Sequence, residues 1–225
     1  LNKTTADTVT LSGTNTYTGI TTVSAGTLVL GASDVMADSA AVTVNGATAV
    51  FAMGSFSDTV GALSIGTDGG SITSSTGALT ASSITFNNTA GNAGSVSAIL
   101  AGGANLVQSG TGTTTLSGTN TYTGTTTISD GTLTLGASDT LSDSTNVIVS
   151  AGTFDLGNYS DTVGGVQLTG GTISNGTLTS TSAFDVQAGT VSAALAGGVG
   201  LNKTTAGTVT LSGTNTYTGI TTVSA

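Results

Sequence analysis

Apolar and polar residues alternate along most of this 225-residue chain, in short stretches separated by Gly, Asn, Asp and Ser. No stretch has the apolar spacing of a helix. The apolar pairs at alternate positions include Val9/Leu11, Leu28/Leu30, Val42/Val44, Leu63/Ile65, Ile84/Phe86, Leu133/Leu135, Val147/Val149, Phe154/Leu156 and Phe184/Val186. Side chains of a β-strand point alternately to its two faces, so a period of two marks a strand with one buried face. The pattern predicts an all-β protein built from many short strands.

One nine-residue phrase, LSGTNTYTG, occurs three times, at residues 11–19, 116–124 and 211–219. Two diverged units, residues 11–115 and 116–210, each carry this phrase, then a GASD segment and then an SDTVG segment, in the same order. The units differ in length by small insertions between the predicted strands. Strong self-similarity with such variation is typical of a stacked repeat protein.

A longer repeat begins again near the end of the chain. Residues 1–25 return at 201–225, and the two copies differ only at Asp7 and Gly207. A flat sandwich closes a finite core and gains nothing from this repetition, whereas a solenoid is extended by it. Thr, Val and small residues suit a narrow core, and glycine without proline suits tight corners between strands whose N–H groups are paired. We predict that residues 1–225 form a single continuous β-solenoid.

The segment TLSGTNTYTGTTTISDGTLTLG, from Thr115 to Gly136, resembles the autotransporter-associated β-strand repeat of bacterial passenger domains. That family shares the pattern L-S-G-x-N-x-Y-x-G-x-T-x-v-x-x-G-x-L-x-L-G. The match is close at 11–31 and at 116–136, and it covers a truncated copy at 211–225. The resemblance implies a right-handed parallel β-helix with roughly 20 residues per coil, in the form of an elongated rod. It also implies a location at the surface of a Gram-negative bacterium or in the extracellular space.

The repeats and the resemblance together predict a non-catalytic structural segment of a secreted bacterial surface protein. We expect this segment to form a repetitive stalk, fibre or filament, with adhesion or aggregation as its output. The predicted partner is the chain itself, by end-to-end or lateral stacking, because the strand edges of an uncapped coil carry unpaired N–H and C=O groups. A cell-surface glycan or protein is a further class of partner.

Charge narrows the function classes further. Eleven acidic residues, all Asp, stand against Lys3 and Lys203, which gives a formal net charge of −9. A nucleic-acid surface needs clustered Lys or Arg, and so does polybasic attachment to anionic lipid. No apolar run approaches the roughly 18 residues of a membrane-spanning helix, and no leader segment is recognised. We therefore expect neither nucleic-acid binding nor direct membrane insertion.

The aspartates are the candidate catalytic groups. A glycosidase needs two carboxyl groups about 5 to 9.5 Å apart. One candidate is Asp34 with Asp38, echoed by Asp139 with Asp143, and the other is Asp58 and Asp161, in the two SDTVG segments. Both are also explained as turn residues whose carboxylates cap backbone N–H groups. The chain has no Arg or His to stabilise developing charge, so we predict that it is not an enzyme. A polysaccharide-binding or polysaccharide-cleaving solenoid that uses these turn aspartates is the alternative.

A metal site is the other chemistry that the aspartates allow. Calcium binds oxygen ligands, and Asp34 with Asp38, or Asp139 with Asp143, could supply two of them. Neither an EF-hand spacing nor the nonapeptide calcium signature of β-helices is present. We predict no cofactor, and a structural calcium ion at one of these pairs stays open as an alternative.

Within LSGTNTYTG, the leucine is predicted to face inward, and the glycines to take the corners. We expect Asn15, Asn120 and Asn215 to satisfy backbone groups at the bend. The alternative function for the phrase lies in Tyr17, Tyr122 and Tyr217. These rings could form a ladder of surface contacts for a glycan or a neighbouring protein, since Tyr offers rigid amphipathic area.

Overall fold

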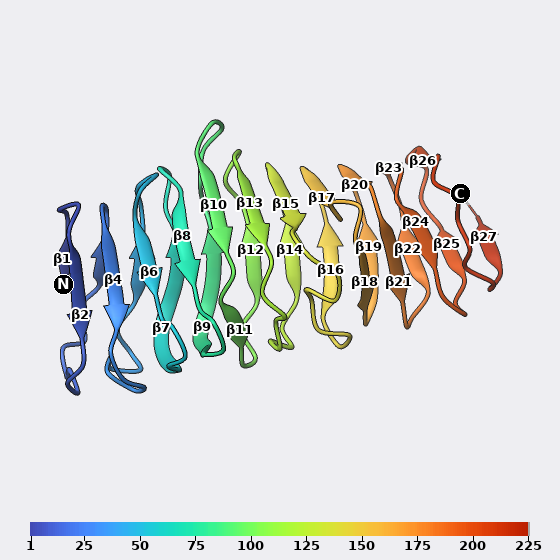
Figure 1. Cartoon of the computed structure of the whole chain (residues 1–225). Helices are drawn as coiled ribbons and strands as arrows, with labels where there is room; N and C mark the ends of the chain where they lie inside the picture. Colours follow the sequence, from blue (N-terminus) through green and yellow to red (C-terminus); the bar gives the residue numbers. More distant parts are fainter. Residues whose placement is uncertain (225) are drawn as a thin grey trace.

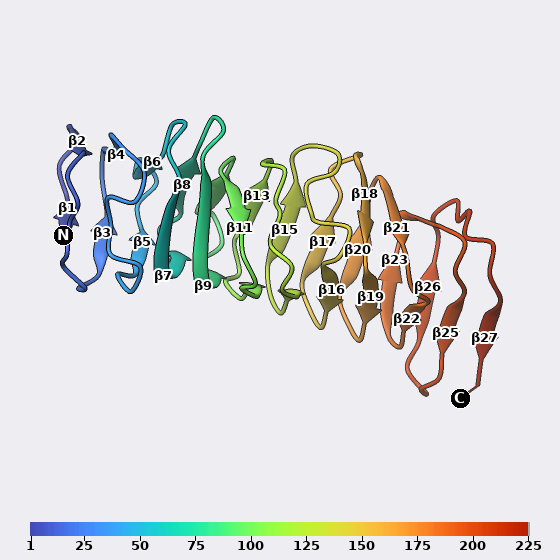
Figure 2. The ribbon, with the colours of Figure 1, turned by 90° about the horizontal axis from the view of Figure 1, so that it is seen from below.

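The chain folds as an elongated rod. The computed structural model describes residues 1–224 and shows a parallel β-solenoid of about 11 turns, spaced roughly 20 residues apart in the sequence. Figure 1 and Figure 2 show successive coils side by side along the rod, with the two termini at opposite ends. At a strand spacing of about 4.8 Å, this number of turns gives a rod length of roughly 50 Å. The all-β parallel solenoid predicted from the alternation is confirmed.

Two long parallel sheets run the length of the rod. Sheet A is formed, in spatial order, by β1 (Asn2–Lys3), β3 (Thr21–Val23), β5 (Val42–Val44), β7 (Asp58–Ile65), β9 (Ala78–Phe86), β12 (Leu106–Gln108), β14 (Thr126–Ile128), β16 (Asn146–Val149), β19 (Gly165–Leu168), β22 (Phe184–Val186), β25 (Leu201–Lys203) and β27 (Thr221–Val223), with β11 (Ile99–Ala101) also paired to β9. Sheet B is formed by β2 (Thr8–Leu11), β4 (Thr27–Leu30), β6 (Val50–Ala52), β8 (Gly70–Thr73), β10 (Ala93–Val96), β13 (Thr113–Leu116), β15 (Thr132–Leu135), β17 (Thr153–Asp155), β20 (Thr172–Ser174), β23 (Gly189–Val191) and β26 (Val209–Leu211). Neither sheet is interrupted at the boundary between the two sequence units.

A third side closes each coil. We call side C the part of a coil that runs from its sheet B strand to the next sheet A strand. In the second unit, side C carries a small sheet of β18 (Ser160–Val163), β21 (Thr177–Ser180) and β24 (Ala194–Ala196). In the first unit, the same place is taken by the first residues of β7 and β9 and by β11, because Asp58 pairs with Leu79 and Leu79 with Leu100.

Alternate residues of most strands fill the interior, as the pattern predicts. In β2, β26 and β27, near the two ends of the described chain, the same positions are exposed or half-buried. In sheet A the inward positions form ladders in which each side chain lies on its counterpart in the next coil. One such ladder runs Thr21, Val42, Leu63, Ile84, Leu106, Thr126, Val147 and Val166. The residues of this ladder are buried, and at roughly 25 cal/mol for each Å² of apolar surface removed from water, such stacking is the main stabilising term of a coil.

Side C follows a five-coil cycle that explains the two sequence units. In three consecutive coils side C is a β-strand. In the next coil it is the irregular LSGTNTYTG segment, and in the fifth it is the GASD corner at residues 31–40 or 136–145. Each sequence unit therefore corresponds to one full cycle of side C, while sheets A and B repeat in every coil.

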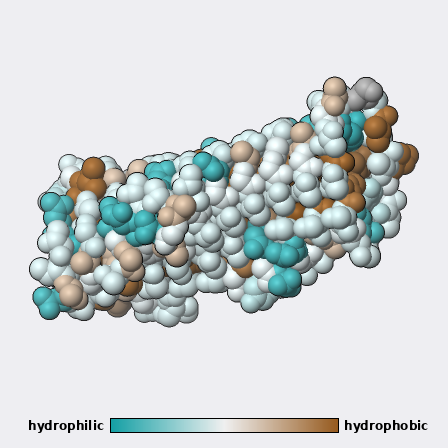
Figure 3. Space-filling view, turned by 90° about the horizontal axis from the view of Figure 1, so that it is seen from above, coloured by the Kyte–Doolittle hydropathy of each residue, from teal (hydrophilic) through white to brown (hydrophobic). Residues whose placement is uncertain are grey.

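Exposed large apolar side chains gather in the first and last coils of the described chain, with Ile20, Ile220 and Val223 the most exposed of them. Figure 3 shows the larger apolar patches toward the ends of the rod. The described residues contain no helix that is long and apolar enough to cross a membrane.

Candidate functional site

The polar residues singled out in the sequence meet on side C, where they belong to one inward-facing column. We call this column the side C ladder. It consists of Asn15, Val35, Asp58, Leu79, Leu100, Asn120, Thr140, Asp161, Leu178, Leu195 and Asn215. The order Asn, corner residue, Asp, Leu, Leu occurs twice and then begins again.

The GASD corner interrupts the backbone ladder of side C. Asp34 and Asp139, the last residues of the two GASD segments, have φ values of 53° and 52°. This left-handed conformation turns the chain, so that the following residues, Val35 and Thr140, cannot pair as strand residues. Their backbone groups are nevertheless buried, and each therefore needs a partner from a neighbouring coil.

An asparagine on one side of the corner supplies the first set of partners. The backbone N–H and the Nδ2 of Asn120 both donate to the carbonyl oxygen of Thr140, at 2.9 Å each. On its other side, Oδ1 of Asn120 accepts the N–H of Leu100 at 2.9 Å, and Nδ2 also donates to the carbonyl of Gly118 at 2.9 Å. Asn120 is 2% exposed. Its side chain thus joins a strand of side C to the corner two coils further on, and the prediction that this asparagine satisfies backbone groups is confirmed.

An aspartate on the other side of the corner supplies the second set. Oδ2 of Asp161 accepts the N–H groups of Thr140 at 2.9 Å and Leu141 at 3.0 Å. In the first unit, Oδ2 of Asp58 accepts the N–H groups of Val35 at 3.0 Å and Met36 at 3.2 Å. The predicted capping of backbone N–H groups is therefore confirmed, but its location was wrong. These aspartates lie in strands, and they cap the preceding coil rather than a turn of their own.

Burial sets the electrostatics of the two aspartates. Asp58 is 2% exposed and Asp161 is 1% exposed. Burial raises the pKa of Asp161 to about 6, because it outweighs the amides of Leu141, Thr140 and Thr162, which stabilise the charge. The nearby Asp139 carboxylate raises this pKa further. Burial likewise raises the pKa of Asp58, against the amides of Met36 and Val35. In both carboxyl groups the second oxygen, Oδ1, is buried and finds no hydrogen-bond partner among residues 1–224.

Asp58 and Asp161 do not form a catalytic pair with each other. Five coils separate them along the side C ladder, which corresponds to roughly 24 Å at a strand spacing of about 4.8 Å. Both carboxyl groups point into the protein rather than toward a surface groove. A glycosidase-type pair of these two residues, at about 5 to 9.5 Å, is thus contradicted by their positions.

The predicted ladder of surface tyrosines is contradicted at Tyr122, which is 0% exposed. Its hydroxyl is 2.6 Å from Oγ1 of Thr126, at the start of β14. Tyr17 and Tyr217 make the same contact four residues on, at 2.9 Å with Thr21 and 2.7 Å with Thr221, and both rings are half-buried. The tyrosine therefore satisfies a threonine that occupies an inward position of sheet A.

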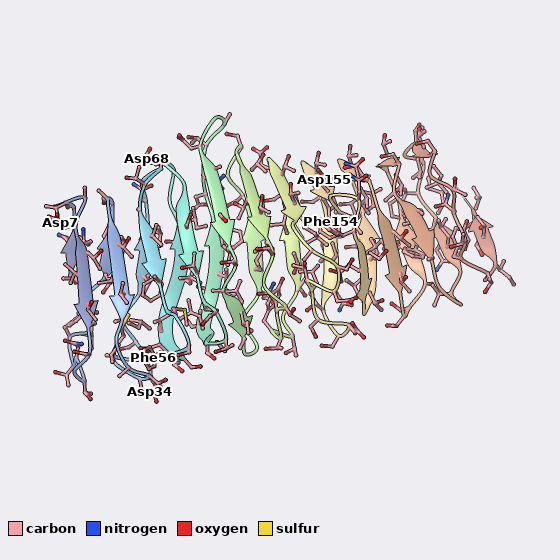
Figure 4. All side chains as sticks on the ribbon, viewed as in Figure 1. Asp7, Asp34, Phe56, Asp68, Phe154 and Asp155 are labelled. Carbon is pink, nitrogen blue, oxygen red and sulfur yellow. The ribbon has the colours of Figure 1, made fainter. Side chains whose placement is uncertain are left out.

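The remaining candidate aspartates lie at the surface. Asp34, Asp38, Asp139 and Asp143 are all exposed, on the two GASD corners. Figure 4 shows Asp34 next to Phe56 at one edge of the rod, opposite the edge where Asp68 lies. Within the described part of the chain, no three His, Cys, Asp or Glu side chains gather into a group that could hold a metal ion. A calcium ion at either corner would therefore have two carboxylates as ligands, from Asp34 with Asp38 or from Asp139 with Asp143.

Several buried polar residues were missed by the sequence analysis, and Lys3 and Gln108 are the clearest examples. Lys3 is 3% exposed, and its ammonium group donates to the carbonyls of Ala25, at 3.1 Å, and Thr5. Gln108 occupies the matching place before the second LSGTNTYTG phrase and donates to the carbonyl of Gly110 at 2.8 Å. Both residues continue the inward alternation of sheet A, and this position in the pattern was the signal available for them.

A shallow groove of about 290 Å³ lies on the outer face of sheet A, over β16, β19 and β22. Two of its polar side chains, Gln167 and Asp185, already bond to each other. Nε2 of Gln167 donates to Oδ2 of Asp185 at 2.7 Å, and Gln187 donates to the other carboxylate oxygen. The Asp185 carboxylate in this groove is thus already occupied by two amide donors.

Comparison with known proteins supports the repeat identified in the sequence. Three segments, residues 1–30, 106–147 and 201–225, match the family model described as the passenger-associated-transport-repeat. The matched segments contain all three LSGTNTYTG phrases, and the middle match also contains a complete GASD corner. No curated protein and no solved structure matches the chain.

Proposed function

Since this chain carries passenger-associated transport repeats, we propose that it is a structural rod segment of a secreted bacterial surface protein. Such a segment forms a repetitive stalk, fibre or filament at the cell surface or in the extracellular space of a Gram-negative bacterium. Its output is adhesion or aggregation. The observation that carries this proposal is the uninterrupted pairing of sheets A and B from the first coil to the last.

The interior supports a structural role because its polar groups are used to hold coils together. The side chains of Asn120, Asp58 and Asp161 bond to backbone groups of neighbouring coils. Tyr122 bonds to a threonine of its own coil. Groups committed in this way maintain the rod, and they favour a structural role over the polysaccharide-cleaving alternative.

Self-association is the partner interaction that we propose, by end-to-end or lateral stacking. Wherever a coil has no neighbour, its strand edges carry unpaired N–H and C=O groups, and end-to-end stacking of two copies would extend sheets A and B. Lateral stacking must overcome the repulsion between rods of net charge −9. That repulsion is screened within about 8 Å at physiological salt but reaches about 30 Å at 0.01 M ionic strength. Salt should therefore promote lateral association.

A sedimentation and electron-microscopy series on the purified chain tests this proposal. We expect single rods at low salt, and bundles or longer filaments as protein and salt concentrations rise. Beads coated with the chain should clump under the same conditions. Monodisperse single rods at every concentration and salt level, with no clumping of beads, would contradict the proposed output.

A glycan panel distinguishes the alternative function in the same preparation. Saturable sugar binding or turnover that is lost in Asp58→Asn or Asp161→Asn, but kept in Asp7→Asn, would favour a binding or cleaving site at the aspartates. Asp7 is exposed and belongs to neither candidate pair, and it serves as the control for charge removal. We expect no binding that depends on these residues.

A further inference from the structure

The two buried aspartates of the side C ladder have one oxygen each that the protein leaves unused. In Asp161, Oδ2 accepts two backbone N–H groups while Oδ1 is buried without a partner in the described structure. Asp58 repeats this arrangement on the other GASD corner. Two corners with different flanking sequences, DVM and DTL, therefore share one geometry.

This geometry treats the two protonation states of the carboxyl group differently. A neutral carboxyl group can still accept both N–H groups through its carbonyl oxygen, so the clamp on the corner survives protonation. An ionised carboxylate instead places negative charge on a buried Oδ1 that no hydrogen bond of the described structure reaches, which is costly in a low-dielectric interior. The amide of the next residue, Thr162 or Thr59, favours the charged form but does not offset this cost of burial. The neutral form is the one that fits the site.

The surroundings of each aspartate add no compensating positive charge. In the coils that precede Asp161, the facing titratable groups are Asp139 on the corner and the Tyr122 hydroxyl. The Asp139 carboxylate disfavours a second negative charge at Asp161. In the coil that follows Asp161, β21 has the sequence TLTS and carries no titratable group. For Asp58, the facing group is Asp34, and β9 above it has no titratable group.

From this geometry we infer that Asp58 and Asp161 are acid-strengthened clamps, which hold the two GASD corners more tightly in mildly acidic than in neutral solution. The rod is then built to gain stability on acidification, whereas proteins that rely on ionised carboxylates lose it. The corners at residues 31–40 and 136–145 are the segments that loosen when the pH rises.

The direction of the change in stability with pH follows from the difference in pKa between the folded and the unfolded chain. The pKa of Asp161 rises from 3.8 in the unfolded chain to about 6 in the folded chain, so the folded state binds its proton more tightly. The stabilising contribution is complete below the unfolded value and is lost as pH rises through the folded value. The pKa of Asp58 is raised in the same direction. The pH window for Asp161 is therefore about 4 to 6.

Carbon-13 NMR of the full chain, with labelled Asp carboxyl groups, tests the inference directly. We expect one carboxyl signal that titrates near pH 6 and that disappears in Asp161→Asn. The Asp143→Asn variant should keep this signal, because Asp143 is exposed on the corner and bonds to neither clamp. If every Asp signal of the unmodified chain titrates near the ordinary value of 3.8, the inference is overturned, and no variant needs to fold for that result.

Thermal unfolding between pH 4.5 and 8 provides the second readout. We expect the Tm of the unmodified chain to fall by about 5 °C from the acidic to the neutral side. Asp143→Asn should show nearly the same fall, since the general relief of charge repulsion is shared by both proteins. Asp161→Asn, which imitates the neutral carboxyl group, should show a clearly smaller fall. Equal pH dependence in the two variants would overturn the inference.

Hydrogen exchange locates the effect. The amides of Thr140 and Leu141, which bond to Asp161, should exchange several-fold faster, after correction for intrinsic rates, at pH 7.5 than at pH 5. The amide of Ile148 lies in β16, the sheet A strand that follows the corner, and its corrected rate should change much less. A uniform change at all three amides would contradict a local clamp.

Discussion

The middle copy of LSGTNTYTG, residues 116–124, lies between two neighbouring coils, whereas the first copy, residues 11–19, has a coil on one side only. Asn120 makes side-chain bonds in both directions along the rod, but the side chain of Asn15 reaches only the coil that follows it. The copy at 211–219 keeps only the contact with the preceding coil, in which Oδ1 of Asn215 accepts the N–H of Leu195. The same nine residues thus acquire their burial from neighbouring coils rather than from their own sequence, which is how a stack with nearest-neighbour stability behaves.

The largest expected difference between the copies is at tyrosine. We expect Tyr122→Ala to lower the free energy of unfolding by about 3–5 kcal/mol, because it empties a fully buried site. Tyr17→Ala removes a half-buried ring and should cost clearly less. Urea unfolding followed by circular dichroism measures both values, and equal losses would refute the dependence on neighbouring coils.

Asparagine gives the next largest difference. Asn120→Ala leaves the buried N–H of Leu100 without its acceptor and removes one donor to Thr140, so a loss of about 3 kcal/mol is expected. Asn15→Ala removes bonds on one side only and should cost about 1 kcal/mol. Faster hydrogen exchange at Leu100 should accompany the first change. An unchanged exchange rate there would argue against Asn120 as the link to that strand.

Replacing a glycine of the phrase by alanine should change stability in opposite directions in the two copies. A Cβ at Gly118 would collide with the backbone carbonyl of Ala98 in the coil below, whereas a Cβ at Gly13 would meet nothing. Gly118→Ala should therefore cost about 2 kcal/mol. Gly13→Ala should be neutral or add about 0.5 kcal/mol of stability, because alanine restricts the unfolded chain. Urea unfolding midpoints measure both changes. Equal midpoints for the two variants would contradict the close contact between coils at Gly118.

The smallest expected effect concerns the tyrosine hydroxyl alone. Tyr122→Phe leaves the buried Oγ1 of Thr126 without its partner and should cost about 1 kcal/mol. Adding Thr126→Val removes the orphaned group, and the double variant should recover most of this loss. A double-mutant cycle by urea unfolding measures the coupling, and simple additivity would mean that the two groups are independent.

The period-two alternation was sufficient to predict the strands and the inward residues, because strand geometry fixes which side chains share a face. Val42 and Val44 are both fully buried, as predicted. The repeated phrases predicted the stacking, and the asparagine of the phrase was correctly expected to satisfy backbone groups. These features depend on local geometry or on repetition, and both can be read from a single sequence.

The burial of Tyr122 could not be predicted by alternation, because the phrase is irregular and alternation applies only to strands. The available signal was Thr126, a polar residue at an inward strand position that needed a partner four residues away. The hydrogen-bond partners of Asp161 could not be predicted from the sequence for a different reason. Its bonds to Thr140 and Leu141 join residues about one coil apart, and only the register between coils brings them together.

The orientation of the strand repeat is the most direct test of coil stacking. Fibre diffraction from aligned rods, or a cryo-electron microscopy map of single rods, gives the direction of the backbone spacing. The structure predicts a repeat of about 4.7–4.9 Å parallel to the long axis of the rod. The same spacing perpendicular to that axis, or a compact particle without an axial repeat, would contradict it.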